Sequence, residues 1–292
     1  MSASVVTHVI VSGLATGCIY ALMALSLVIV YNATRTLNFA QGEMLMVSTF
    51  VGWTAHDALG LPLSLTLVVA VAAAGALALA LERLVIRRAI GATHWDVLII
   101  TLGLSLMLRA AAGIVWTHDE FPFPSFFPTR PVAVGPVRLA PVSLGIIGAS
   151  LALMLALAAL FQWTRLGRAM RAVAQSQRAA RLMGISVERV YSSAWVLAAV
   201  VGAIAGVLVA PVIFLSSKMG LIVINGFTAA VLGGFGSMPG AVLGGMLLGV
   251  LENLAPLYLP SGVRYSVPFI ALIGILLVRP AGLLGRVEAR KV

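Results

Sequence analysis

The stretch from Thr164 to Val190 reads TRLGRAMRAVAQSQRAARLMGISVERV and is the longest well-charged segment of the chain. It contains six arginines and one acid, Glu188. The apolar runs on both sides are too long for the core of an ordinary soluble domain. A basic segment between two membrane-spanning helices indicates a cytoplasmic loop, because loops rich in Lys and Arg stay on the cytoplasmic side. We therefore predict that residues 165–189 form a cytoplasmic loop.

The composition argues against a soluble protein. Of the 292 residues, 61% are hydrophobic and only 10% are charged, and the mean hydropathy is +1.09. Soluble domains carry about 25% charged residues, so the polar surface here is too small to cover a water-facing globule. The long apolar runs predict an all-α polytopic membrane protein, with residues 1–292 in one transmembrane domain. Cys18 is the only cysteine, which excludes an intrachain disulfide.

The net charge of +10 is concentrated in three basic clusters. They are Arg83, Arg87 and Arg88; the six arginines of the loop; and Arg279, Arg286, Arg290 and Lys291. Each cluster flanks an apolar run. This arrangement is typical of the positive-inside pattern of membrane proteins and argues against a nucleic-acid surface.

Nine apolar runs predict about eight or nine transmembrane helices, some of them short or interrupted. The runs cover residues 9–31, 44–56, 62–81, 97–116, 142–163, 191–212, 226–235, 241–254 and 266–278. The second, seventh and eighth fall short of the ~20 residues that a span needs. With residues 165–189 in the cytoplasm, the Pro-rich segment 117–141 is expected outside and the tail 279–292 in the cytoplasm. The first apolar run is expected to be retained as a membrane span rather than removed as a signal peptide. If the second run also crosses the whole membrane, the N-terminus lies outside.

Four of the Gly-x-x-x-Gly pairs in the sequence predict close helix packing. They are Gly13 and Gly17, Gly202 and Gly206, Gly240 and Gly244, and Gly245 and Gly249. Such pairs let helix backbones approach closely in lipid, either within one chain or at a dimer face. We favour packing within the chain.

No motif for catalysis, nucleotide binding or metal binding occurs in the sequence. The only lysines, Lys218 and Lys291, do not stand in a phosphate-loop motif. The four histidines are scattered, and there are no cysteine pairs. We therefore expect neither an enzyme nor a cofactor. Arg109 is expected near the outer interface, the alternative being a substrate role. Glu43 and Glu252 are expected at interfaces, at the ends of their spans.

Two interrupted segments are candidates for a translocation path. NFAQGE covers residues 38–43, and NGFTAAVLGGFGSMPG covers residues 225–240. Interrupted helices in transporters expose backbone groups and helix ends to the substrate path. The candidate residues are Asn38, Gln41, Glu43, Asn225, Gly234 and Gly236. The alternative is that both segments are cytoplasmic turns between hairpin helices.

The basic loop is predicted to contain a short amphipathic helix. Ala172, Ala179, Ala180, Leu182 and Met183 give it a face of small and apolar residues, and Gly184 ends it. Such a helix inserts into a groove of a soluble partner or lies on anionic lipid head groups. The pattern alone leaves both open.

Three motifs carry a resemblance to a known family. They are GLATGCIYALMALSLVIVYNATRTLNFAQGEMLM, AQSQRAARLMGISVERVYSSAWVLAAVVGAIAGVL and FTAAVLGGFGSMPGAVLGGMLLGVLENL. In this order they resemble the branched-chain amino acid ABC-transporter permease family, and within it the H-type subunit. The family norm INFAHGE reads LNFAQGE here, so Gln41 replaces a histidine and argues against a protonation role at that position.

The resemblance implies a bacterial inner-membrane permease with the ABC importer fold. It would pair with a second, non-identical permease, two cytoplasmic ATPases and a periplasmic binding protein. By the same resemblance, ATPase coupling would fall on Arg171, Ala179, Ala180, Arg181, Met183 and Gly184. The implied cargo is leucine, isoleucine or valine, with urea, amides or other amino acids as alternatives. A stand-alone carrier and a membrane scaffold are the competing hypotheses.

Overall fold

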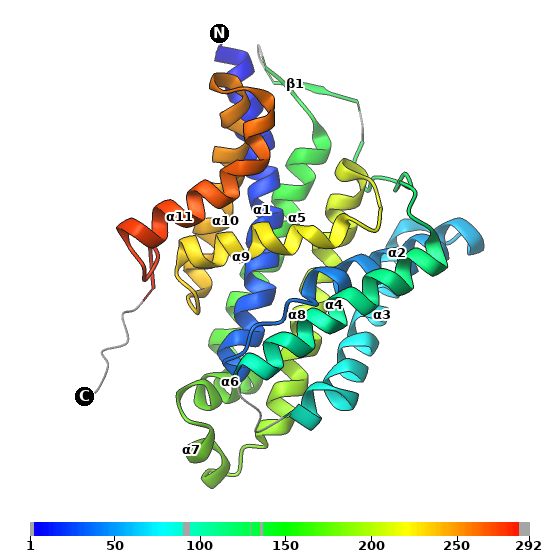
Figure 1. Cartoon of the computed structure of the whole chain (residues 1–292). Helices are drawn as coiled ribbons and strands as arrows, with labels where there is room; N and C mark the ends of the chain where they lie inside the picture. Colours follow the sequence, from blue (N-terminus) through cyan, green and yellow to red (C-terminus); the bar gives the residue numbers. More distant parts are fainter. Residues whose placement is uncertain (1–2, 90–93, 129, 135–136, 286–292) are drawn as a thin grey trace. The chain divides into compact units, whose positions relative to one another are not determined.

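The computed structural model describes residues 3–89, 94–128, 130–134 and 137–285. The described chain is largely helical (Figure 1). Its longer helices are α1 (Ala3–Thr34), α2 (Gln41–Leu59), α3 (Leu63–Leu84), α4 (His94–Trp116), α5 (Pro141–Trp163), α8 (Val187–Ile213) and α10 (Met238–Tyr258). Shorter ones are α6 (Arg165–Gln175), α7 (Gln177–Leu182), α9 (Ile222–Gly233) and α11 (Val267–Val278). Three 3-10 helices are η1 (Ile86–Ala89), η2 (Met219–Leu221) and η3 (Ser261–Ser266).

Among the described residues, six helices are long and apolar enough to cross a membrane. They are α1, α3, α4, α5, α8 and α10, while the apolar helices α9 and α11 are shorter. The predicted class, an all-α polytopic membrane protein, is confirmed. The eighth run, residues 241–254, was predicted too short: α10 has 21 residues, because it begins at Met238 after the cap Ser237 and continues to Tyr258.

The Pro-rich segment contains a small hairpin. Strands β1 (Val132–Val134) and β2 (Val137–Leu139) pair antiparallel, with Val132 opposite Leu139. Proline has no backbone N–H and restricts the residue before it, so helix formation is blocked here. The prediction that this segment is not a spanning helix is confirmed for its described residues.

The contacts divide the chain into two compact units. Unit one contains Met1–Val28, Phe127–Leu151 and Ile224–Val292, and unit two contains Ile29–Phe126 and Ala152–Val223. The prediction of one transmembrane domain is not tested by this division. Each unit is described by itself.

Unit two is built around α2, which packs against α3, α4 and α8. α3 and α8 also pack against each other. Small residues permit this proximity: a Cβ atom added at Gly206 of α8 would lie 2.9 Å from Cγ of Leu45 in α2. A Cβ atom added at Gly52 of α2 would lie 3.0 Å from Cβ of Ala70 in α3.

Unit one is held by close backbone contact between α1 and α10. A Cβ atom added at Gly13 would lie 2.9 Å from Cα of Val250, and one at Gly17 would lie 2.8 Å from Cα of Met246. Gly245 and Gly249 of α10 face the backbone of α1 in turn. All four Gly-x-x-x-Gly pairs contact elements of the same unit, so the prediction of packing within the chain is confirmed.

Candidate functional site

The turn that leads into α2 is fixed by two buried amide side chains. The Asn38 side chain accepts from the backbone N–H of Ala40 at 3.1 Å and donates to Gln41 Oε1 at 3.2 Å. Gln41 Nε2 donates to the carbonyl oxygen of Ala198 in α8 at 2.9 Å. Both side chains are about 1% exposed. Their amides therefore tie the start of α2 to α8.

Glu43, in the first turn of α2, forms an ion pair with Arg109 of α4. Arg109 Nε donates to Glu43 Oε1 at 3.0 Å, and Nη2 donates to the same oxygen. The Glu43 side chain is 2% exposed and the Arg109 side chain 37%. Glu43 Oε2 has no hydrogen-bond partner within the described part of the chain.

This pair joins two residues that the sequence placed separately. The guanidinium of Arg109 is paired with a carboxylate 66 residues away in sequence. Glu43 lies in the first turn of its helix, as expected, and its side chain is buried within the protein. The expected position of both residues near a membrane interface stays a prediction. Sequence reasoning missed the pair because neither residue carries a local signal for the other.

A break in the helices faces Glu43. Between α8 and α9 the backbone leaves the helix at Phe214, which has φ +60°, and Leu215 forms an antiparallel bridge with Phe121. η2 then brings Gly220 against the carboxylate of Glu43, and the Gly220 carbonyl lies against Gly42. A side chain at either glycine would collide with these atoms. Sequence reasoning did not single out this break; its signal was the polar run SSK, residues 216–218, after a long apolar run.

In unit one, a second buried glutamate has partners for both oxygens. Tyr20 of α1 donates to Glu252 Oε2 at 2.7 Å, and Arg264 Nε donates to Oε1 at 3.2 Å. Glu252 is 6% exposed. It is buried where α1, α10 and η3 meet, and its expected position at a membrane interface stays a prediction.

The other path candidates in unit one lie on α9 and the turn after it. Asn225 is half-buried on α9. Gly234 and Gly236 have φ of +104° and +97°, which favour glycine. The C-terminal segment covers this turn: the backbone N–H groups of Leu283 and Leu284 donate to the carbonyls of Leu232 and Gly233 at 2.9 Å. This geometry favours the interpretation of residues 234–237 as a turn between two helices.

The basic loop forms two helices rather than the single one predicted. Ser176 has extended backbone and separates α6 from α7, because its hydroxyl accepts from the N–H of Ala179 at 3.2 Å and caps α7. Thr164 and Ser186 cap α6 and α8 in the same way. Gly184, with φ +78°, follows the end of α7, as predicted.

The residues of the predicted apolar face of the loop do not share one surface, because some are buried and others are exposed. Ala180 is buried, at 3% exposure, whereas Leu182 and Met183 are 83% and 81% exposed. Arg181 pairs with Glu188 at 3.0 Å, and Arg171 donates to the carbonyl of Phe161. Ala180 therefore holds α7 in place, while Leu182 and Met183 form an exposed apolar pair.

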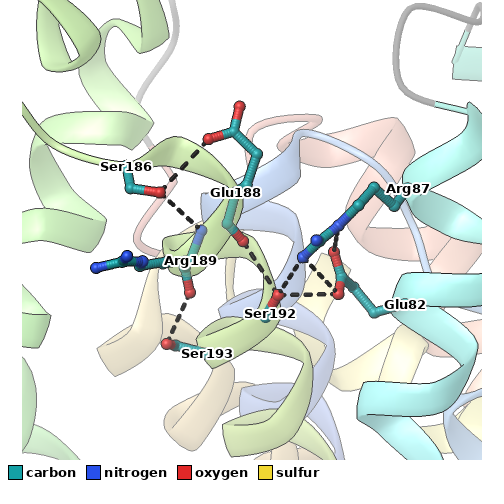
Figure 2. A network of polar contacts seen from close by, with 7 residues as sticks. All are labelled: Glu82, Arg87, Ser186, Glu188, Arg189, Ser192 and Ser193. Carbon is teal, nitrogen blue, oxygen red and sulfur yellow. Dashed lines mark hydrogen bonds and ion pairs between the residues drawn. The ribbon is translucent and has the colours of Figure 1, made fainter.

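Close in sequence to this loop, the start of α8 is joined to the end of α3 by the network drawn in Figure 2. Arg87 donates to both oxygens of the buried Glu82, each at 3.2 Å, and to Ser192 Oγ at 2.8 Å. Ser192 Oγ lies 2.9 Å from Glu82 Oε2 and 3.1 Å from the carbonyl oxygen of Glu188. The start of α8, next to the loop, is thereby tied to the end of α3.

In the residues that the structure describes, no group of three or more His, Cys, Asp or Glu side chains is placed to hold a metal ion. Three ion pairs in this part of the chain involve a buried glutamate, and they join α2 to α4, α3 to η1, and α10 to η3. They define a multi-pass membrane protein with charged groups buried among its helices.

Comparison with known proteins then identifies the family. The family described as branched-chain amino acid transport system / permease component matches residues 9–278. The chain belongs to this family, as its motifs predicted. It is 34% identical to the high-affinity branched-chain amino acid transport system permease protein LivH of Escherichia coli, over 96% of both chains. It is 32% identical to the corresponding protein BraD of Pseudomonas aeruginosa, over 97% of both chains.

A solved structure also resembles the chain. PsaBC from Streptococcus pneumoniae in complex with Fab covers 91% of this chain, with 89% of that chain covered, at 16% identity and a TM-score of 0.48. A similarity this low supports no shared mechanism. The membership in the permease family rests on the sequence matches, and the chain is a transport permease.

Proposed function

We propose that the chain is the permease subunit of an ATP-driven importer of branched-chain amino acids in the bacterial inner membrane. Its partners would be two cytoplasmic ATPases, a second permease and a periplasmic binding protein. The family match over residues 9–278 carries this proposal, together with the similarity over nearly the whole chain to LivH and BraD, which are high-affinity branched-chain amino acid permease proteins. The lack of a phosphate-loop motif in the sequence is consistent with ATP hydrolysis on a partner.

The topology in this proposal follows from the basic clusters. Residues 165–189 and 279–292 would lie in the cytoplasm and residues 117–141 in the periplasm. Residues 286–292 of the tail lie outside the described residues. The contact of the C-terminal segment with the turn at residues 234–237 would then place that turn on the cytoplasmic side.

Coupling to the ATPases would occur at α7. Leu182 and Met183 project from it, flanked by the exposed arginines Arg178 and Arg181. Apolar anchors with charged neighbours suit a groove on a soluble partner. Ala179 and Gly184 would contribute exposed surface, while Ala180 and Arg171 would keep the loop in its shape. The candidate path residues of unit two are Asn38, Gln41 and Glu43, and those of unit one are Asn225, Gly234 and Gly236.

Co-purification tests the proposal. The chain, co-expressed with the ATPases and second permease encoded beside it, is extracted in mild detergent and captured by a tag at Val292. We expect recovery of the ATPases, loss of that recovery with Met183→Glu, and unchanged recovery with Leu259→Gln, an exposed residue on the loop after α10. Recovery of the chain alone, with transport of leucine in liposomes, would establish a stand-alone carrier instead. Uptake of urea or amides but not of leucine would reassign the cargo.

A further inference from the structure

We propose that the Glu43–Arg109 pair is the binding site for the charged head group of the transported amino acid. Arg109 would bind the α-carboxylate, and Glu43 would bind the α-ammonium group. The inference rests on the proposed function, because it takes an amino acid as the cargo.

The first observation is the unused hydrogen-bonding capacity of Glu43. Arg109 donates to Oε1 through Nε and Nη2. Oε2 has no partner by hydrogen-bond geometry in the described part of the chain, and the Ser105 side chain of α4 is the other polar group that interacts with this carboxyl. A buried carboxylate oxygen without a partner is unfavourable, and such groups are rare in native structures. An ammonium group carries three N–H donors and would satisfy this oxygen.

The other two buried glutamates show that this is not a general property of the molecule. Glu82 accepts from Arg87 on both oxygens, and Glu252 accepts from Tyr20 and Arg264. These pairs are complete and need no ligand. Glu43 alone among the three is left with an open oxygen.

The second observation is that Arg109 is partly exposed and has hydrogen-bond donors that the ion pair does not use. Its side chain is 37% exposed, and a guanidinium has five donors in a planar fork, of which the ion pair uses two nitrogens. That fork matches a carboxylate with two parallel hydrogen bonds. A zwitterion would exchange charge for charge, since its carboxylate replaces Glu43 at Arg109 while its ammonium group neutralises Glu43. No buried charge is then left without a counter-charge, which is the costly outcome.

The third observation is the backbone around the pair. Two interruptions meet here: the turn at residues 38–40 before α2, and the segment 214–221 with Gly220 against Glu43. Glu43 also lies in the first turn of α2. Interrupted backbone within a membrane protein is tolerated where it is buried in protein or lines a cavity, and transporters build substrate sites from it. The geometry therefore favours a ligand site over a purely structural ion pair.

Direct binding tests the inference. The full-length chain in lipid nanodiscs is titrated with radiolabelled L-leucine in a scintillation proximity assay. We expect saturable binding by the wild type, weakened by about tenfold or more in Glu43→Gln and in Arg109→Gln. Glu82→Gln is the matched control, since it alters a buried Glu–Arg pair of the same unit, and we expect its affinity to be unchanged. Equal affinity in wild type and a folded Glu43→Gln would overturn the inference, as would an equal loss in Glu82→Gln.

A competition experiment on the wild type removes the dependence on folding of the variants. Unlabelled 4-methylpentanoate lacks the ammonium group, and 3-methylbutylamine lacks the carboxylate. We expect each to displace L-leucine about tenfold more weakly than L-leucine itself, because each leaves one member of the pair without a partner. Displacement by either compound as well as by L-leucine would contradict the assignment.

These outcomes are separable from failure of the proposed function. Recovery of the ATPases and leucine uptake by the assembled complex, with no leucine binding by the wild-type chain at millimolar concentration, would overturn the inference alone. Loss of both ATPase recovery and leucine uptake would overturn the proposed function.

Discussion

The surroundings of Glu82 and of Glu43 differ in how completely the buried carboxylate is bonded. Both glutamates are about 2% exposed in their side chains, and each faces an arginine that is between a third and two fifths exposed. Glu82 accepts from Arg87 on both oxygens and also has Ser192 beside it. Glu43 is bonded on one oxygen only. An ion pair in which both carboxylate oxygens are hydrogen-bonded serves to join two elements. An ion pair with one carboxylate oxygen unbonded can still accept a hydrogen bond from a ligand.

Breaking the complete pair should give the largest loss of stability. Arg87→Ala leaves the carboxylate of Glu82 buried without its counter-charge, which we expect to lower the free energy of unfolding by about 3 kcal/mol. The value is at the lower end of the usual range because Arg87 is 39% exposed. SDS titration of the chain in mixed micelles measures it. The control is the double variant Glu82→Gln with Arg87→Ala, which should recover part of the loss; no recovery would mean that Arg87 acts through packing.

The second largest loss of stability should come from disturbing the close contact between Gly42 and Gly220, beside Glu43. Gly42→Ala places a Cβ atom against the carbonyl oxygen of Gly220, and such overpacking costs about 2 kcal/mol. The same SDS titration measures this loss. Gly103→Ala is the control, because no atom lies within 4 Å of a Cβ at Gly103 of α4, and we expect it to be neutral or slightly stabilising. Equal stability of the two variants would show that the contact between Gly42 and Gly220 is not tight.

The third glutamate can be converted to resemble Glu43. Tyr20→Phe removes the donor to Glu252 Oε2 and leaves that oxygen buried without its partner. We expect the free energy of unfolding to fall by about 1 to 2 kcal/mol. Tyr258→Phe serves as the control, since Tyr258 is 73% exposed and should change stability by less than about 0.5 kcal/mol. If neither substitution changes the free energy of unfolding, the hydrogen bond from Tyr20 to Glu252 contributes little to stability.

The smallest effect concerns the hydroxyl beside Glu82. Ser192→Ala removes a group that lies 2.9 Å from Glu82 Oε2 and accepts from Arg87, and we expect a loss of about 1 kcal/mol. The adjacent Ser193 donates only to the carbonyl of Arg189 in its own helix, at 2.8 Å, so Ser193→Ala should be close to neutral. Thermal unfolding of both variants in the same detergent measures the difference in their stability. A larger loss in Ser193→Ala than in Ser192→Ala would exclude a stabilising role for the network.

Much of the architecture was predictable because membrane helices are encoded by continuous apolar runs. The run 142–163 became α5 with a difference of one residue at its start, and the caps Thr164, Ser176 and Ser186 divide the basic loop as local chemistry dictates. The glycine pairs likewise predicted close packing. What periodicity and hydropathy could not supply was the partner of each charged or polar residue. Arg109 and Glu43 are 66 residues apart, and Tyr20 and Glu252 are 232 apart.

The sequence by itself determined the class of protein, the family and the presence of a basic loop, since composition, apolar run length and local motifs depend only on neighbouring residues. The tertiary structure decided which charges are buried, that Ala180 points inward while Leu182 and Met183 point outward, and that Gly220 meets Glu43. These outcomes depend on the packing of helices that are distant in the chain. An oxygen without a partner, such as Glu43 Oε2, becomes visible only when every neighbour in space is known.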